Sequence, residues 1–126
     1  GMGIQSLLKS YENYLNNGNV AAILGLYGKD PIFMPQHAPA LIGRDAVKAG
    51  YEGVFKTIDL DIVFTIHEVE EKGDWAWART SSAGQVKVLA NGQSGPESNN
   101  ELFVFKKESG EWKIHRYIFS TTNPPR

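Results

Sequence analysis

The sequence has no cysteine among its 126 residues. Disulfide bonds and thiolate metal sites are therefore excluded, and this composition suits a reducing compartment, so we expect a cytoplasmic protein. A surplus of charge is also missing, because 13 Lys and Arg stand against 14 Asp and Glu, for a formal net charge of -1. Without a basic surplus, neither nucleic acid nor an anionic membrane is an expected partner.

Long apolar runs are absent as well. No stretch approaches the roughly 18 apolar residues of a membrane span, and Met2 is not followed by the basic and apolar regions of a secretory signal, so we expect a soluble chain. Gly1 reads as an expression-tag remnant, and residues 2–126 are expected to form one domain, because a chain of this length folds around a single core. The histidines at 37, 67 and 115 lack ligand spacing, so neither a metal site nor a cofactor is expected.

Three segments have the apolar spacing of amphipathic helices: Ile4 to Asn17, Val20 to Tyr27, and Arg44 to Ile58. Asn17-Gly18 provides a helix stop and Asn19 an N-cap for the second segment. Between the last two helices the chain opens like a buried strand at Ile32. Prolines at 31, 35 and 39 then stiffen a loop that carries His37.

Beyond the third helix the apolar period changes to two, which is typical of antiparallel strands. Strands are predicted at Asp59 to Glu70, Trp75 to Ser81, Glu101 to Lys106 and Trp112 to Ser120, with turns at Lys72-Gly73-Asp74, Asn91-Gly92 and Ser109-Gly110. We predict an α+β fold in which about three N-terminal helices pack on one strongly curved, mixed or antiparallel sheet of cystatin-like topology. Such a sheet forms a cone whose mouth is a natural pocket.

Several segments carry a family resemblance over nearly the whole chain. The stretches LGLYGKDPIFMP, IGRDAVKAGYE and ELFVFKKESGEWKIHRYIFST resemble the nuclear transport factor 2-like superfamily. Within it the chain looks most like the small SnoaL-like proteins related to the calcium/calmodulin-dependent kinase association domain, and less like ketosteroid isomerases and scytalone dehydratases. The resemblance implies the cone fold but no one reaction, because this fold hosts enzymes, binders and assembly modules.

The resemblance can be carried over position by position. It implies that Tyr11 takes the place of the isomerases' oxyanion-binding tyrosine and Glu101 that of their protonated acid. Their general-base aspartate falls on Pro35, which cannot move a proton. The isomerase reaction as that family runs it is therefore not expected, and another group must act as base if chemistry occurs.

Strand alternation, with Glu101 facing the cavity as the resemblance implies, predicts the cavity lining. Phe105 and Ser81 are placed on the same inner face, as is His115. The predicted ligand-binding residues are Arg79, Glu101, Tyr14, Tyr51, Phe33, Met34, Trp77, Phe103, Tyr117 and Phe119. This aromatic chamber with a few polar groups is typical of a site for a planar or apolar small molecule.

Two readings of the polar groups stay open. Arg79 and Glu101 form either a ligand clamp or a buried ion pair, and in both cases a nearby guanidinium would keep Glu101 ionised. His115, His37 and Tyr11 are the candidate catalytic residues, since each histidine titrates near neutral pH, although each histidine has an alternative structural role.

Two functions therefore compete. The first is a small-molecule site, either a binder or a cofactor-free isomerase, lyase or cyclase acting on a hydrophobic carbonyl or carboxylate metabolite. The second is a non-catalytic association module. Both predict a homodimer through the sheet, with Trp112 and Ile118 in the seam.

Overall fold

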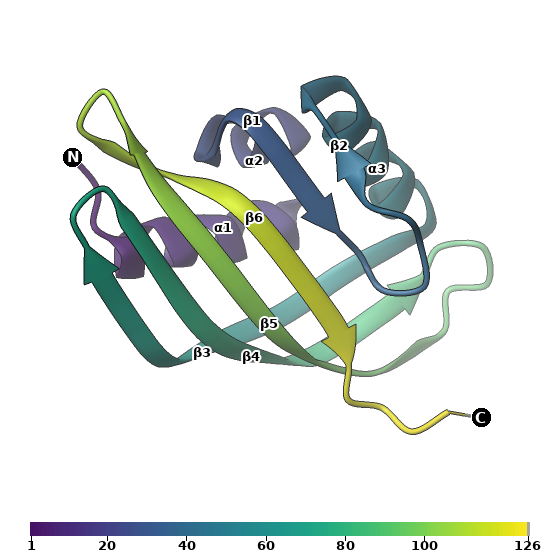
Figure 1. The fold of residues 1–126 in the computed structure, drawn as a ribbon. Helices are drawn as coiled ribbons and strands as arrows, with labels where there is room; N and C mark the ends of the chain where they lie inside the picture. Colours follow the sequence, from purple (N-terminus) through teal and green to yellow (C-terminus); the bar gives the residue numbers. More distant parts are fainter. Residues whose placement is uncertain (126) are drawn as a thin grey trace.

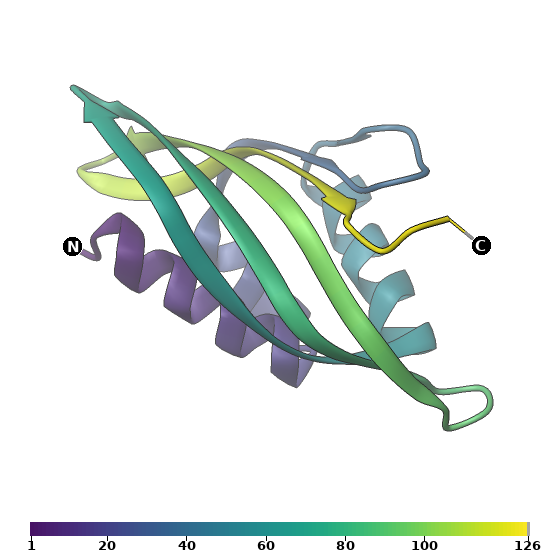
Figure 2. The same cartoon turned by 90° about the horizontal axis from the view of Figure 1, so that it is seen from below.

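The computed structural model describes residues 1–125, which form three helices and a sheet of six strands. The elements are α1 (Ile4–Asn17), α2 (Val20–Leu26), β1 (Tyr27–Met34), β2 (Leu41–Ile42), α3 (Arg44–Thr57), β3 (Ile58–Lys72), β4 (Trp75–Val88), β5 (Ser94–Glu108) and β6 (Glu111–Thr121). All helices lie on one side of the sheet (Figures 1 and 2). The predicted α+β cone is confirmed.

The strands run in the order β2-β1-β6-β5-β4-β3. β1 is parallel to β6, and every other neighbouring pair is antiparallel, so the sheet is mixed and open at β2 and β3. Figure 2 shows the long strands β3, β4 and β5 curving across the helices. β3 and β4 approach closely at Gly84, where a Cβ would collide with the Asp61 carbonyl, so this position needs a glycine.

Side chains of α1 cover the free edge of β3. Asn16 donates from Nδ2 to the Ile62 carbonyl at 2.8 Å and accepts from the Ile62 N–H at 2.9 Å. The Phe64 N–H donates to the buried Glu12 carboxylate at 2.8 Å. Because an edge strand exposes unpaired backbone groups, these bonds replace a missing neighbour strand and fix the helix against the sheet.

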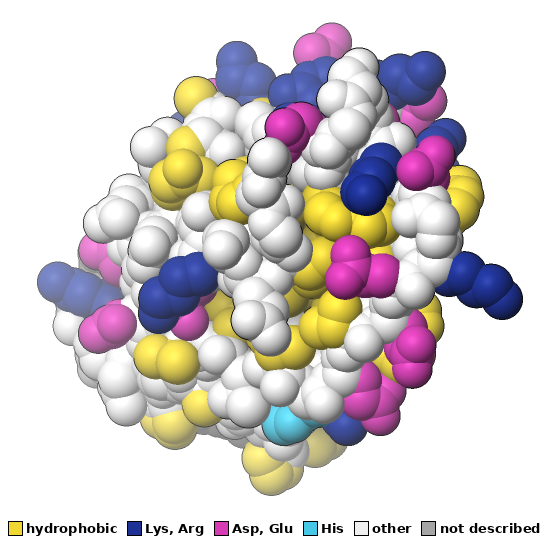
Figure 3. Space-filling model, turned by 90° about the vertical axis from the view of Figure 1, so that its left-hand side faces the viewer, with side chains coloured by type: hydrophobic (Ala, Val, Ile, Leu, Met, Phe, Trp, Pro, Cys, Tyr) yellow, Lys and Arg dark blue, Asp and Glu magenta, His cyan; other side chains and the backbone are white. Residues whose placement is uncertain are grey.

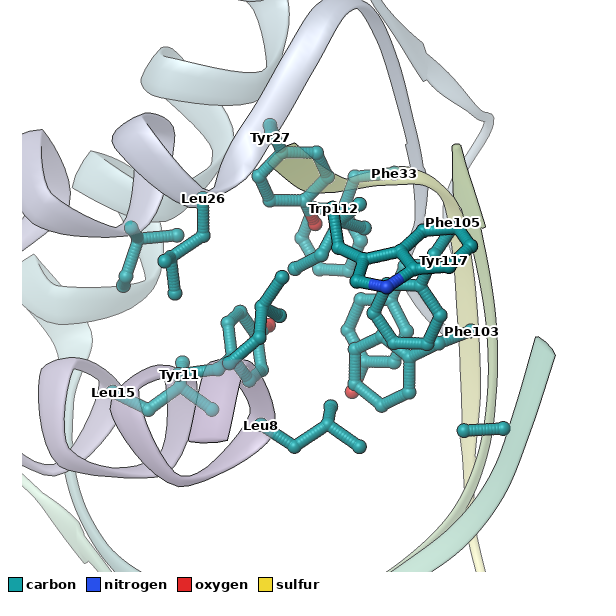
Figure 4. Packing of buried hydrophobic residues seen from close by; sticks show 14 of the residues in the cluster. Leu8, Tyr11, Leu15, Leu26, Tyr27, Phe33, Phe103, Phe105, Trp112 and Tyr117 are labelled. Atoms are coloured by element: carbon teal, nitrogen blue, oxygen red, sulfur yellow. The ribbon is translucent and has the colours of Figure 1, made fainter. Parts of the chain in front are cut away.

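The core lies between α1 and the inner faces of β5 and β6 (Figure 4). Phe103 stacks on Tyr117 with ring centroids 4.1 Å apart and on Phe105 at 5.8 Å. Tyr11 meets Phe103 and Tyr117 edge-on, each at 5.6 Å. Burial of these rings removes apolar surface from water and so contributes to the stability of the fold.

The element boundaries differ from the sequence predictions at several places. β1 begins at Tyr27, directly after α2, and residues 41–42 form the short strand β2. β5 begins at Ser94 rather than Glu101, because Gly95 and Pro96 continue the ladder with β4. These residues have low strand propensity, and pairing with a long neighbour overrides that preference.

On the face shown in Figure 3, basic and acidic side chains are interspersed and not gathered by sign. This distribution matches the nearly balanced composition, with a net charge of -1, and gives no single-sign field to steer a polyanion. Among residues 1–125, no helix is long and apolar enough to cross a membrane.

Candidate functional site

A cavity of about 220 Å³ lies between the helices and the curved sheet. Its walls come from α1, α3, the end of β1 and the inner faces of β3 to β6. It is lined by Tyr11, Leu15, Phe33, Pro35, Gln36, Tyr51, Val54, Ile58, Leu60, Ile62, Phe64, Ser82, Glu97, Asn99, Glu101, Tyr117 and Phe119.

One wall of the cavity is a series of parallel rings. Phe33 stacks on Tyr51 with centroids 4.7 Å apart and planes 9° from parallel. It also stacks on Tyr117 at 5.5 Å and 6°, and Tyr117 is followed by Phe119 at 6.0 Å. Such a wall offers flat apolar surface to a ligand ring.

Three tyrosine hydroxyls form a buried chain beside this wall. The Tyr11 and Tyr51 hydroxyls are 2.7 Å apart, and those of Tyr51 and Tyr27 are 2.6 Å apart. Burial is the largest cause that raises the pKa of all three phenols, so they stay neutral and keep their hydrogens. The three hydroxyls have three hydrogens, and only two of these are needed for the two hydrogen bonds among them. One hydroxyl hydrogen is therefore left for another acceptor.

The wall beside these rings is polar and comes from β4 and β5, where Glu101 lies next to Phe119 of β6. The Thr80 hydroxyl donates to Glu101 Oε1 at 2.7 Å, and the Ser82 hydroxyl donates to Glu101 Oε2 at 2.6 Å. Asn99 Nδ2 donates to Ser82 Oγ at 3.3 Å and to Glu97 Oε2 at 3.0 Å. These bonds hold two carboxyl groups in fixed positions along one strand.

The buried carboxyl of Glu101 has a raised pKa. Burial is the main cause, and the negative charge of Glu97 raises the pKa further, while the hydrogen bonds from Ser82 and Thr80 oppose the shift. Glu101 therefore holds its proton to a higher pH than an ordinary glutamate, which makes it a suitable proton donor.

Many of the predicted residues meet in this cavity. Tyr11 and Glu101 both line it, as does Pro35, which the sequence resemblance sets at the isomerases' base position. Tyr51, Phe33, Tyr117 and Phe119 line it as well. Their placement agrees with the sequence prediction, while their roles in binding or catalysis stay predictions.

The predicted position of Arg79 is wrong. Residues directly opposite one another on antiparallel strands share a face, and Thr80, not Arg79, lies opposite Glu101. The Arg79 side chain is 54% exposed on the outer face, where its Nε lies 3.4 Å from Glu68 Oε1. Trp77 and Ser81 share this outer face, so the prediction for them is also wrong. With the guanidinium outside, neither the clamp nor the buried ion pair exists, and Glu101 is not held ionised by it.

The two candidate catalytic histidines also lie outside the cavity. A bulge between β5 and β6 pairs Ile114 with Phe105 and Arg116 with Val104, which leaves His115 without a partner in the ladder. Strict alternation fails at such an extra residue, and the His115 ring packs against the exposed Trp75 at 5.3 Å. Burial and the cations Arg116 and Lys106 lower the His115 pKa. His37 is exposed in the loop after β1.

Three further predicted residues do not line the cavity. Phe103 is fully buried beneath its wall, and Tyr14 packs half-buried against the core. Met34 is also half-buried and alternates with Phe33 to face away from the cavity. None of these three side chains faces the cavity.

Four polar residues that line the cavity were not predicted from the sequence: Gln36, Ser82, Glu97 and Asn99. Glu97 and Asn99 precede Glu101 by four and two positions, so the same alternation would have found them had the strand been extended toward the N-terminus. Ser82 lies two residues beyond Thr80 on the inner face of β4. Among residues 1–125, no group of three or more His, Asp or Glu side chains is arranged to hold a metal ion.

A model of the SnoaL-like domain family matches residues 8–115. Over 87 residues the chain is 28% identical to extracellular metalloproteinase NpIII of Aspergillus oryzae, an alignment that covers 66% of this chain and 14% of that protein. The chain thus spans only about 14% of the length of this relative.

Solved structures show the same fold. A ketosteroid isomerase-like protein from Erwinia carotovora atroseptica is 30% identical, with a TM-score of 0.91 and coverage of 96% of this chain and 95% of that one. A calcium/calmodulin-dependent protein kinase II association domain-like protein from Xanthomonas campestris is 18% identical, with a TM-score of 0.75 and coverage of 94% and 85%. The latter shows the fold alone. The resemblance to SnoaL-like, nuclear transport factor 2-like proteins inferred from the sequence is confirmed. The expected lesser likeness to ketosteroid isomerases is not, because the ketosteroid isomerase-like structure is the more similar of these two.

Proposed function

The chain belongs to the SnoaL-like domain family, and on this basis we propose that its cavity binds a small, neutral, oxygen-bearing ring compound and transfers a proton on it. The observation that carries this proposal is a buried carboxyl of raised pKa inside an aromatic cavity. Buried ionisable groups with shifted pKa values gather at functional sites.

The cavity size limits the ligand. A cavity of about 150 Å³ accommodates benzene, so the volume of about 220 Å³ suits one ring with small substituents. A carbonyl or carboxylate ligand was predicted from the sequence, with Tyr11 and Arg79 as the residues that hold its oxygen. Because that guanidinium lies on the outer face, a neutral oxygen is favoured.

Two carboxyl groups on one strand supply the proposed chemistry. Glu101 would donate a hydrogen bond or a proton to the ligand oxygen, and Glu97, which is half-buried and lines the same cavity, would accept a proton from carbon. On a cyclic ketone this exchange forms an enol, and the reverse step restores the ketone. A base and an acid acting together in this way define isomerase or lyase chemistry.

Binding is tested by calorimetry with cyclohexanone and cyclohexanol. Val54→Trp fills the cavity, and Val63→Trp makes the same change at a position that is 60% exposed. We expect binding to the wild type and to Val63→Trp and its loss in Val54→Trp. Equal binding to all three proteins would place the ligand elsewhere and contradict the proposal.

Proton transfer is tested by NMR in heavy water. The wild type should catalyse deuterium exchange at the carbons beside the cyclohexanone carbonyl. Glu97→Gln and Glu101→Gln should each reduce this rate at least about tenfold, whereas Glu71→Gln, at an exposed position, should not. If exchange with the wild type is no faster than in solvent alone, the protein does not transfer a proton on this ketone, and only the proposal that the cavity binds a ligand remains.

The outer face supports a second proposal, a homodimer through the sheet. On adjacent strands, Arg79 lies opposite Leu102, and Leu102 lies opposite Ile118. The Leu102 and Ile118 side chains are 43% and 46% exposed. The neighbouring Arg79 and Glu68 carry opposite charges, so a twofold axis can set each against its counterpart in a second copy. Trp112 is only 8% exposed and cannot form the seam, which corrects that prediction.

Sedimentation tests this dimer. Leu102→Lys should shift the protein to monomer at micromolar concentration, and Leu89→Lys, in the β4–β5 turn and 41% exposed, should not. A wild type that sediments as a monomer contradicts the dimer. A dimer that binds neither ring compound would support the association module over the enzyme.

A further inference from the structure

One buried polar atom of the cavity has no role in the hydrogen-bond network described above. Asn99 is only 6% exposed, and its Oδ1 has no hydrogen-bond partner among the described residues. Asn99 also lines the cavity. A buried acceptor without a partner costs free energy in the folded protein, so such an atom needs an explanation.

The orientation of the Asn99 amide follows from its neighbours. Nδ2 lies 3.0 Å from Glu97 Oε2 and 3.3 Å from Ser82 Oγ. A carboxylate only accepts, and the single Ser82 hydrogen is already donated to Glu101. Turning the amide over would set Oδ1 against two acceptors, so Nδ2 must face them and Oδ1 must remain the free atom.

The rest of this wall also offers acceptors. The hydroxyl hydrogens of Thr80 and Ser82 are both donated to Glu101. The two amide hydrogens of Asn99 are donated to Ser82 and Glu97. Of the described side chains that line the cavity, none is Lys, Arg or His. Apart from the Glu101 carboxyl, the proposed proton donor, this wall therefore meets a ligand with oxygen lone pairs, and no cation lines it.

We infer that Asn99 Oδ1 is a specificity-determining acceptor that selects ring compounds carrying an O–H or N–H donor. This inference rests on the proposed function and names its ligand class more narrowly. A hydroxyl or amide hydrogen would satisfy Oδ1, while a second oxygen near Glu101 could still react. A carboxylate would meet two carboxyl groups and no counter-charge, which disfavours its binding.

The wild-type protein is tested first, by calorimetry with four compounds that share a six-membered ring. Cyclohexanol should bind about tenfold more tightly than cyclohexanone, which has the oxygen but no hydrogen on it. Cyclohexanecarboxamide, which is neutral, tells an N–H donor from a hydroxyl, and cyclohexanecarboxylate should bind most weakly. If the ketone or the carboxylate binds as tightly as the better of the two donors, the inference is wrong.

The variant Asn99→Leu then assigns the effect to one side chain. It should bring the affinity for cyclohexanol down to that for cyclohexanone and leave the ketone affinity unchanged, while Asn100→Leu on the exposed outer face should change neither. An equal loss for both compounds would mean that Asn99 only supports the wall, and no loss for either would mean that Oδ1 takes no part. Both outcomes overturn the inference but leave the proposed function standing, whereas binding of none of the four compounds removes both.

Discussion

On two neighbouring strands, β4 and β5, the large side chains lie on opposite faces of the sheet. On β4 the inner positions Ala76 and Ala78 are 4% and 0% exposed, whereas Trp75 and Trp77 on the outer face are 46% and 36% exposed. On β5 the large residues Phe103 and Phe105 are the inner ones, both at 0%. The small residues of β4 leave room for the rings of β5, because Ala78 lies directly opposite Phe103.

This contrast explains why hydrophobicity alone misassigned β4. Both of its faces are apolar, so alternation separates them without saying which is buried. Placing the tryptophans inward took Arg79 into the cavity with them, although it lies outside. Where both faces of a strand are apolar, the size of the side chains on the neighbouring strand determines which face is buried. That neighbour is distant in the sequence, so the local pattern does not show it.

The strongest test of the two faces truncates adjacent residues of β5. Phe103→Ala should lower the free energy of unfolding by about 3–5 kcal/mol, because it removes a fully buried ring and leaves a cavity. Leu102→Ala, at a side chain that is 43% exposed, should cost about 1 kcal/mol. Urea unfolding followed by circular dichroism measures both, and similar losses would contradict the described packing.

Enlarging a small residue of β4 also distinguishes the packed inner face from the exposed outer face. Ala78→Leu adds volume where no space exists, so we expect a loss of about 1–3 kcal/mol in unfolding free energy. Ala83→Leu on the same strand is exposed and should stay within about 0.5 kcal/mol of the wild type. A stable Ala78→Leu variant would mean that the inner face is loosely packed.

The inner carboxyl makes stability depend on pH. The folded-state pKa of Glu101 is raised above the ordinary value of 4.5. Between pH 4.5 and the raised pKa, the native state therefore holds a proton that the unfolded chain has released. Wild-type stability contributed by this group is therefore complete below pH 4.5 and is lost as pH rises through the raised pKa. Glu101→Gln has no such proton and should gain stability relative to the wild type across that range.

A pH series of urea unfolding curves measures this difference, with Glu71→Gln on the exposed β3–β4 hairpin as reference. If the stability of Glu101→Gln follows the wild type at every pH, Glu101 titrates alike in the folded and unfolded chains. That result would also weaken its proposed role as proton donor.

The sequence was sufficient for the fold but not for the whole site. Apolar periodicity gave the three helices and the four long strands, and the turn at Ser109-Gly110 follows from Gly110, which accepts its positive φ. Tyr11 and Glu101 were placed through family resemblance. Asn99 and Glu97 were missed because polar residues beside Gly95 and Pro96 look like a loop, and only the ladder with β4 shows that they face inward.

The bulge at His115 marks a second limit. Nothing in the alternating segment Trp112 to Ser120 indicates where an extra residue interrupts the ladder, since the neighbours Ile114 and Tyr117 are both apolar. A bulge depends on how two strands bend together, which is a tertiary property. Alternation counted from Tyr117 is therefore correct toward Phe119 and wrong toward His115.

The smallest expected effect is that of Arg79→Ala. Its ion pair with Glu68 is exposed on both sides, and exposed pairs contribute at most about 1 kcal/mol, so we expect a change within about 0.5 kcal/mol. Binding of cyclohexanol and cyclohexanone should be unchanged, because the guanidinium and the cavity lie on opposite faces of the sheet. Calorimetry alongside Glu101→Gln makes the comparison direct. Loss of binding in Arg79→Ala with binding intact in Glu101→Gln would reverse the assignment of the two faces and return the carboxylate ligand to consideration.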